Sequence, residues 1–192
     1  MGTERSRQVR ERLLAAAGEL IVERGWSAVS TRVLAERAGV GAGLVHYHFP
    51  SLNALLNEAS LGVMASVAEQ TLAQLEGTAP QEGLDLVLAA LDAYPGDDPT
   101  STLFVEAYLA AGRDAELRRG ITDVLERFRG PLADWLRAGG IDDPESTARV
   151  LASAVDGVML HRTLDPGLDG AAVASVLRRL LTPAHPTAKE RE

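Results

Sequence analysis

Apolar residues recur every three or four positions along most of this 192-residue chain, and this spacing limits the fold more than any other feature of the sequence. Such spacing places apolar side chains on one face of an α-helix. No segment shows the alternation of apolar and polar residues expected of a half-buried strand, and runs of β-branched residues are few. The sequence therefore predicts an all-α protein of about nine helices.

Glycine, proline and capping residues mark the ends of these helices. Ser30 is suited to cap a helix start with its hydroxyl, and Gly39 is suited to the left-handed turn that ends the same helix. The predicted helices cover residues 6–24, 30–39, 41–49, 50–76, 81–94, 100–111, 114–138, 144–164 and 169–182. We expect residues 1–50 to form a head of three helices, residues 51–183 a larger helical body, and residues 184–192 a disordered tail.

The second and third predicted helices have the spacing of a helix-turn-helix. Ala35 is small enough to let two helices cross closely, and Gly39, four residues later, makes the turn. Val45 follows six residues after the glycine and is placed to pack the second helix on the first. Any helical hairpin with a glycine turn can show this spacing. The long helix in front of it and the helix that starts at residues 50–51 strengthen the prediction of a DNA-binding head.

The charge distribution is compatible with a nucleic-acid partner although the net charge is −8. Residues 1–60 carry seven arginines and six glutamates, whereas residues 61–192 carry 12 basic and 21 acidic groups. Arg5, Arg7 and Arg10 are expected to form a flexible arm that reaches a phosphate backbone, or else merely a solvated terminus. The chain has no cysteine, no long apolar run and a charged N-terminus, which together predict a soluble, cytoplasmic protein without a membrane segment.

Residues 8–60, with STRVLAERAGVGAGLVHYHF at positions 30–49 in their centre, resemble the DNA-binding domain of the TetR family of bacterial transcriptional regulators. Segments 103–121 and 156–166 resemble that family's ligand-binding and dimerisation domain more loosely. The resemblance implies a homodimeric regulator, most often a repressor, that binds a palindromic operator and is released by a small, largely apolar molecule. No cofactor, metal or enzyme activity is expected.

The resemblance also implies which residues meet DNA. Arg32 is expected on the backbone and on a guanine edge, whose two acceptors match the guanidinium fork. Ala42, Gly43 and His46 fall at base-facing positions of the third helix, where the small residues let the helix approach the groove floor. The whole expected set is Ser30, Thr31, Arg32, Ala42, Gly43, Leu44, His46, Tyr47, His48 and Ser51.

Three positions depart from the family's usual pattern. His46 stands where tyrosine is common, Leu44 where threonine or serine is frequent, and Leu52 where lysine is common. The missing lysine removes one phosphate contact, so we expect the salt slope of DNA binding to be smaller by about one unit than in a relative that keeps it.

Each of these residues also has a simpler interpretation. His46 and His48 suggest a metal pair, but two residues apart on a helix they point in different directions, which disfavours such a site. Tyr47 is also explained as a surface residue that packs on the head without a role in DNA binding. Arg32 is also explained as an ion-pair partner of Glu36, four residues later.

Aromatic residues of the body predict a largely apolar ligand pocket. The candidates are Phe104, Tyr108, Phe128, Trp135 and His161. His161, Arg162 or Glu106 would supply the few polar anchors that such pockets use. The alternative is that these stripes are plain core. Pro131 lies inside the predicted helix 114–138 and predicts a kink.

The last two helices, at about 144–164 and 169–182, are the candidates for dimerisation. Their apolar faces would form a four-helix bundle across a two-fold axis, although the same faces would also serve as internal core. Two other functions stay open. One is a partner-binding dimer that has lost DNA reading, and the other is an all-α enzyme, for which no catalytic motif is found.

Overall fold

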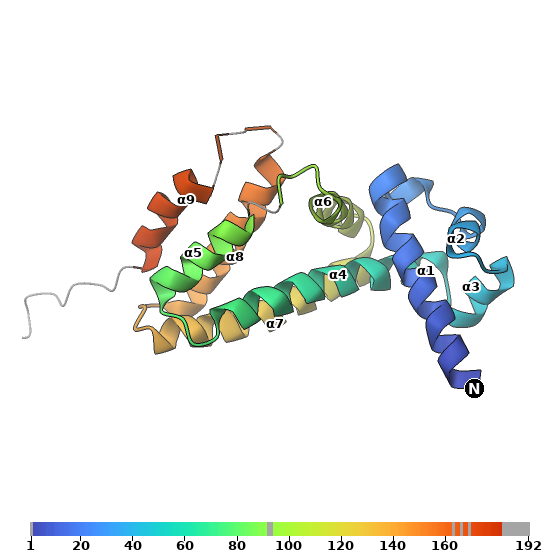
Figure 1. Ribbon diagram of the computed structural model, residues 1–192, viewed down its shortest axis with the longest axis horizontal. Helices are drawn as coiled ribbons and strands as arrows, with labels where there is room; N and C mark the ends of the chain where they lie inside the picture. The colour runs from blue at the N-terminus through green and yellow to red at the C-terminus, as the bar shows by residue number, and fades with distance from the viewer. Residues whose placement is uncertain (1, 92–93, 163, 166, 169, 182–192) are drawn as a thin grey trace, which may run out of the picture. The chain divides into compact units, whose positions relative to one another are not determined.

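The computed structural model describes residues 2–91, 94–162, 164–165, 167–168 and 170–181, and within these ranges the chain forms helices and no strand. The α-helices are α1 (Gly2–Arg24), α2 (Thr31–Ala38), α3 (Ala42–His48), α4 (Leu52–Leu75), α5 (Pro80–Leu91), α6 (Pro99–Ala111), α7 (Ala115–Ala138), α8 (Pro144–His161) and α9 (Gly170–Leu177), with the 3₁₀ turns η1 (Trp26–Ala28) and η2 (Arg178–Leu181) (Figure 1). The all-α prediction is confirmed. No helix in the described ranges is long and apolar enough to cross a membrane.

The N-terminus differs from its prediction. The expected flexible arginine arm is wrong for the described residues, because α1 already begins at Gly2. Arg7 donates hydrogen bonds to the carboxylates of Glu4 and Glu11 at 2.8 and 3.2 Å. Pairs of opposite charge three and four residues apart support a helix, which explains the extra turn.

Three later helices end earlier than predicted. Helix α5 ends at Leu91, α8 ends at His161, and α9 gives way at residue 178 to the 3₁₀ turn η2. Helix α7 continues through Pro131 to Ala138 without a break. The predicted disordered tail, residues 184–192, lies outside the described residues.

Aspartates cap three of the later helices. The Asp98 carboxylate accepts hydrogen bonds from the backbone N–H groups of Thr100 and Ser101 at 2.9 and 3.0 Å, at the start of α6. Asp143 caps α8. Asp114 caps α7, and the hydrogen bond from the Leu117 N–H is the largest cause that holds the pKa of its carboxyl below the ordinary value. A side-chain oxygen thus satisfies backbone donors that would otherwise be unpaired.

One of the two compact units of the chain contains residues 1–67 and 97–124. It includes more than the predicted three-helix head, because α6 and the first parts of α4 and α7 belong to it. The backbone N–H of Trp26 donates to the Glu106 carboxylate of α6 at 2.7 Å. Asn57 of α4 donates to Asp114 at 3.3 Å. The largest fully buried apolar residues of this unit are Leu13, Leu20, Ile21, Leu34, Val45, Leu55, Leu56 and Leu117.

The second unit contains residues 68–96 and 125–192. Trp135 joins the α4–α5 connection to α7, since its Nε1 donates to the Thr78 carbonyl at 3.0 Å. A Cβ atom added to Gly83 would lie 2.4 Å from the Trp135 ring, so only glycine fits there. Buried residues of its core include Leu75, Leu84, Leu88, Leu91, Leu132, Leu136, Leu151, Val158, Val173, Leu177 and Leu181.

Candidate nucleic-acid interface

The start of α2 is fixed by a serine cap, as predicted. Ser30 has an extended backbone, and its hydroxyl oxygen accepts a hydrogen bond from the Val33 N–H at 3.4 Å. Thr31 and Arg32 form the first turn, and Arg32 is exposed. Arg32 makes no ion pair with Glu36 or with any other described residue. The simpler explanation of Arg32 as a partner of Glu36 is therefore not supported by the structure.

The turn between α2 and α3 is built on Gly39. This residue has φ 63° and ψ 41°, in the left-handed region that glycine enters at little cost. The N–H groups of Gly39 and Val40 donate to the carbonyls of Glu36 and Ala35 at 3.1 and 2.9 Å. This pair of hydrogen bonds is the Schellman motif, which ends a helix and reverses the chain direction.

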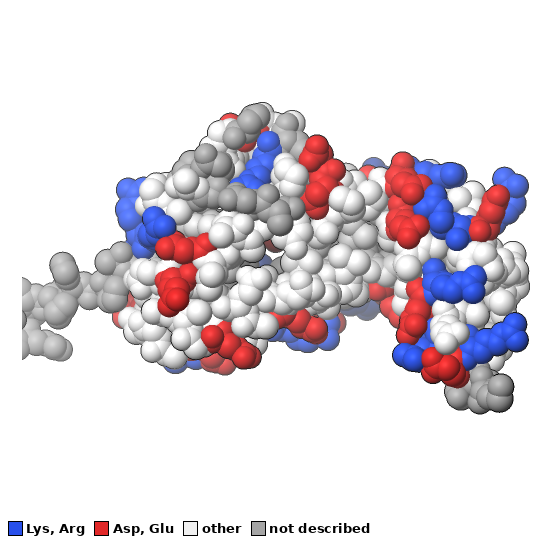
Figure 2. Space-filling model, in the orientation of Figure 1, with Lys and Arg blue, Asp and Glu red and all other residues white. Residues whose placement is uncertain are grey.

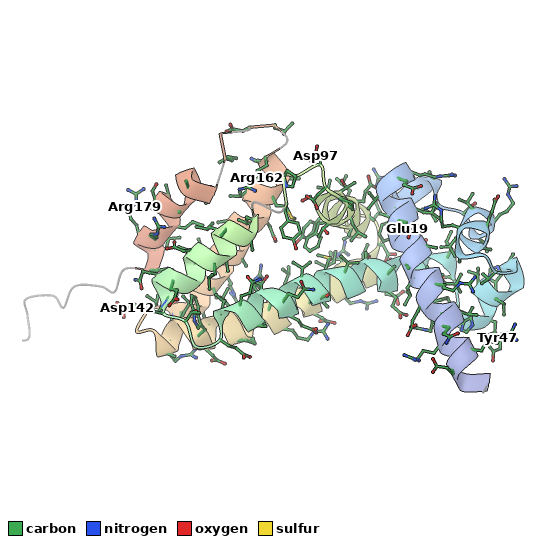
Figure 3. All side chains as sticks on the ribbon, viewed as in Figure 1. Glu19, Tyr47, Asp97, Asp142, Arg162 and Arg179 are labelled. Carbon is green, nitrogen blue, oxygen red and sulfur yellow. The ribbon has the colours of Figure 1, made fainter. Side chains whose placement is uncertain are left out.

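Helix α3 has one buried face and one exposed face. Val45 and the C-cap residue Phe49 are buried, with 1 and 3% of their surface accessible, and they attach the helix to the core of the head. Tyr47 is 76% exposed and lies on the outer surface of the head (Figure 3). Its ring meets that of His48 edge to face at 5.1 Å between centres. The other exposed residues of this face are Ala42, Gly43, Leu44 and His46.

Helix α4 follows α3 after residues 49–51. The Ser51 hydroxyl oxygen accepts from the Ala54 N–H at 3.0 Å, so Ser51 caps this helix. Leu52, which stands where lysine is common in the family that the sequence resembles, is partly buried. The ten predicted DNA-contact residues thus lie on α2, on α3 and at the residues that cap α2 and α4.

Most arginines of the head are engaged within the protein. Arg37 of α2 donates to Glu23 and Glu19 of α1 at 2.6 and 3.0 Å, and these hydrogen bonds hold the pKa of Arg37 above its ordinary value. Figure 2 shows positive and negative groups side by side over α1 and α2 rather than one basic surface on this face. The other arginines of positions 1–60 are Arg5, Arg24 and Arg32, and of these Arg24 contributes to the lowered pKa of the Glu23 carboxyl.

The contacts of two further arginines were not predicted from the sequence, and one of these arginines, Arg10, was expected in the flexible arm. Arg10 pairs with Glu58 at 2.5 Å, and its guanidinium lies 4.9 Å from the centre of the Phe49 ring. Arg12 donates to the carbonyls of Ala38 and Gly39, at 2.8 Å for the latter. Their partners lie 26 or more residues away, so no local spacing indicates these contacts.

The predicted ligand-pocket residues are divided between the two units. Phe104 and Tyr108 belong to the first unit, where their rings meet edge to face at 6.4 Å between centres. The other candidates, Phe128, Trp135 and His161, belong to the second unit. Phe128 and Trp135 pack against its core, and His161 is exposed at the end of α8.

Two of the suggested polar anchors are engaged by the backbone. Glu106 accepts the Trp26 N–H, and Arg162, at the end of α8, donates to the carbonyls of Leu168 and Leu91 (Figure 3). In the described part of the chain, no group of three or more histidine, aspartate or glutamate residues is placed to hold a metal ion.

Comparison with known families gives two matches along the chain. Residues 13–59 match the family described as "Bacterial regulatory proteins, tetR family". Residues 78–183 match the family described as "Tetracyclin repressor-like, C-terminal domain". The two matches follow each other in sequence and together cover most of the chain.

Individual relatives agree with these matches. The HTH-type transcriptional regulator BetI of Rhizobium meliloti (strain 1021) is 28% identical over 158 residues, which is 81% of this chain and 78% of that protein. The crystal structure of a transcriptional regulator from Streptomyces coelicolor A3(2) has 30% identity and a TM-score of 0.77, covering 91% of this chain and 99% of that one. FadR from Bacillus subtilis, solved in complex with stearoyl-CoA, shares the fold at 22% identity, with a TM-score of 0.71 and coverage of 91 and 99%.

Proposed function

The chain belongs to the TetR family of bacterial regulatory proteins, and we propose that it regulates transcription by binding operator DNA through α2 and α3. In the proposed form, it is a homodimer on a palindromic operator in the cytoplasm, and it represses until a small, largely apolar molecule releases it. The observation that carries this proposal is the two-faced helix α3. Val45 and Phe49 attach it to the head, while its remaining surface is free to enter a major groove.

Base reading is assigned to few side chains. Arg32 is exposed and has no partner among the described residues, so its donors are available to the two acceptors of a guanine. His46 supplies a second polar contact. Ala42 and Gly43 let the backbone of α3 approach the bases, and the methyl group of Ala42 suits a thymine methyl.

The remaining predicted residues are assigned to the phosphates. The hydroxyl oxygens of Ser30 and Ser51 accept backbone N–H groups, which leaves each O–H free to donate to a phosphate oxygen. Thr31, Tyr47 and His48 present further donors. Leu44 belongs to the same set by position but offers only apolar contact.

Salt dependence tests DNA binding by the full chain. Because most arginines of the head are engaged by carboxylates or backbone carbonyls, we expect a modest slope of log K against log salt, between about −2 and −5. The measurement is fluorescence anisotropy of a labelled duplex from the protein's own promoter region between low and moderate salt. A flat response, or no binding at low salt, would contradict the proposal.

Dimerisation is assigned to α8, α9 and η2. Large apolar side chains on these elements are exposed in the single chain, namely Val150, Leu160, Val176 and Leu180. Paired across a two-fold axis, they would lose contact with water and form a four-helix bundle. A two-fold dimer matches the symmetry of a palindromic operator.

Release by an effector follows from the aromatic and apolar residues of the body. The stearoyl-CoA complex of the Bacillus subtilis protein indicates that this fold can hold a ligand with a long apolar part. We expect an apolar compound to raise the thermal unfolding midpoint of the protein and to release it from promoter DNA. A screen by thermal shift, followed by anisotropy, measures both effects. Stabilising compounds that all leave DNA binding unchanged would show that the pocket is not the switch.

A second candidate function is a partner-binding dimer without DNA reading. The observation in its favour is Leu44, which is 39% exposed in the position where a hydroxyl is frequent in the family. The salt experiment separates the two functions, because a partner-binding dimer would not bind the promoter duplex at low salt. Neither of these two candidate functions includes a catalytic activity.

A further inference from the structure

Arg12 of α1 reaches the turn between α2 and α3. Its Nη2 donates to the Gly39 carbonyl at 2.8 Å and also to the Ala38 carbonyl. Carbonyls at the end of a helix have no partner within the helix. A positive guanidinium at this end is also attracted by the partial negative charge of the helix dipole, which stabilises the helix. Arg12 therefore completes the end of α2 from a different helix.

The turn and Arg12 fit each other closely. The Schellman hydrogen bonds satisfy the carbonyls of Ala35 and Glu36, and Arg12 donates to two carbonyls further along the turn, those of Ala38 and Gly39. A Cβ atom on Gly39 would lie 3.0 Å from Nη2 of Arg12. Glycine is thus favoured at this position both by its positive φ and by the close guanidinium.

A second arginine joins the same two helices in the opposite direction. Arg37 projects from the last turn of α2 and donates to Glu19 and Glu23 of α1. Arg37 holds the body of α2 against α1, whereas Arg12 holds the backbone that leads directly into α3. Of the two, only Arg12 contacts the turn that sets the direction of α3.

We infer that Arg12 is a positioning residue for base recognition, which fixes the direction in which α3 enters the groove. This inference rests on the proposed DNA-binding function. Contacts to base edges require accurate placement of α3, whereas contacts to the phosphates supply most non-specific affinity and tolerate small displacements. Loss of Arg12 therefore lowers discrimination between DNA sequences more than it lowers general affinity.

The test compares the full-length wild type with Arg12→Ala and Arg12→Lys. Two duplexes are used, one selected by the wild type from a random pool and one scrambled duplex of the same length, each over a range of salt. We expect Arg12→Ala to bind the selected duplex about tenfold more weakly and the scrambled duplex within about twofold of wild type, with an unchanged salt slope. Arg12→Lys, which retains a charged donor, should recover most of the discrimination.

Arg118→Ala is the matched control. Arg118 also caps a helix end in the first unit, since it donates to the Ala111 carbonyl at 3.2 Å, but it has no contact with the turn. Arg118→Ala removes the same charge and the same kind of hydrogen bond as Arg12→Ala but leaves the turn at Gly39 intact. We therefore expect it to retain the preference for the selected duplex over the scrambled one. Equal loss of discrimination in Arg118→Ala and Arg12→Ala would overturn the inference, because it would trace the effect to general loosening of the unit.

Two other outcomes also overturn the inference. Unchanged binding of both duplexes by Arg12→Ala would show that the turn holds its geometry without the guanidinium. Equal weakening on both duplexes, with a salt slope smaller by about one, would make Arg12 a phosphate contact.

Amide hydrogen exchange in the DNA-free protein gives an independent readout, in which Arg12→Ala should speed exchange at Val40. A wild type that selects no duplex would refute the proposed function, while the exchange rate at Val40 would still decide whether Arg12 orders the turn.

Discussion

Replacing Arg32 by alanine is expected to lower the preference of the protein for its operator over unrelated DNA by about tenfold to a hundredfold. An arginine that binds both acceptors of a guanine contributes about 1–3 kcal/mol of discrimination. Arg32 is exposed at the first turn of α2 and has no partner among the described residues, so nothing in the head competes for its donors. Anisotropy on operator and scrambled duplexes measures the preference directly.

Tyr47→Phe is the comparison for Arg32→Ala. It removes only a hydroxyl from a side chain that is 76% exposed and assigned to a phosphate. We expect it to weaken binding to both duplexes by a similar, small factor, because phosphate contacts carry little sequence information. If Tyr47→Phe costs more discrimination than Arg32→Ala, the roles of these two residues have been assigned wrongly.

Phe49→Ala is expected to have the largest effect on the stability of the head. Phe49 is 3% exposed at the end of α3, with the guanidinium of Arg10 over its ring. Truncation of a buried phenylalanine lowers the free energy of unfolding by about 3–5 kcal/mol, a large part of the 5–15 kcal/mol that typically stabilises a domain. Helix α3 would lose its attachment, and operator binding should fall with it. Urea unfolding followed by circular dichroism measures the change.

Tyr47→Ala is the stability control, because it removes an aromatic ring two residues away on the exposed face. We expect it to change the free energy of unfolding by no more than about 0.5 kcal/mol. A loss below about 1 kcal/mol in Phe49→Ala would show that Phe49 is not what attaches α3 to the core.

The helices themselves could be predicted because their signals are local. Ser30 caps α2 and Gly39 ends it, and both roles depend on the hydroxyl or the missing side chain of that residue alone. The same holds for Ser51. The burial of Val45 on α3 followed from its spacing after Gly39. The exposed face was thereby also determined, since each helix residue that is not turned inward faces the solvent.

The contacts that orient these helices could not be predicted, because they join distant positions. Arg12 and the Gly39 carbonyl are 27 residues apart, and Trp135 and the Thr78 carbonyl are 57 apart. The arginines near the N-terminus were expected in a flexible arm because their count was considered without their partners. Glu4 and Glu11 flank Arg7 at helical spacing, and that pattern, visible in the sequence, is the signal that would have predicted the helix.

Selection from a random pool of duplex DNA by the full-length protein tests the central claim most directly. If α2 and α3 read DNA in a two-fold dimer, the enriched sequences should contain an inverted repeat. The centres of its half-sites should be separated by about 34–36 Å, or one helical turn, or by a multiple of that distance. Failure to enrich any sequence, or enrichment of a single site without an inverted repeat, would contradict the account.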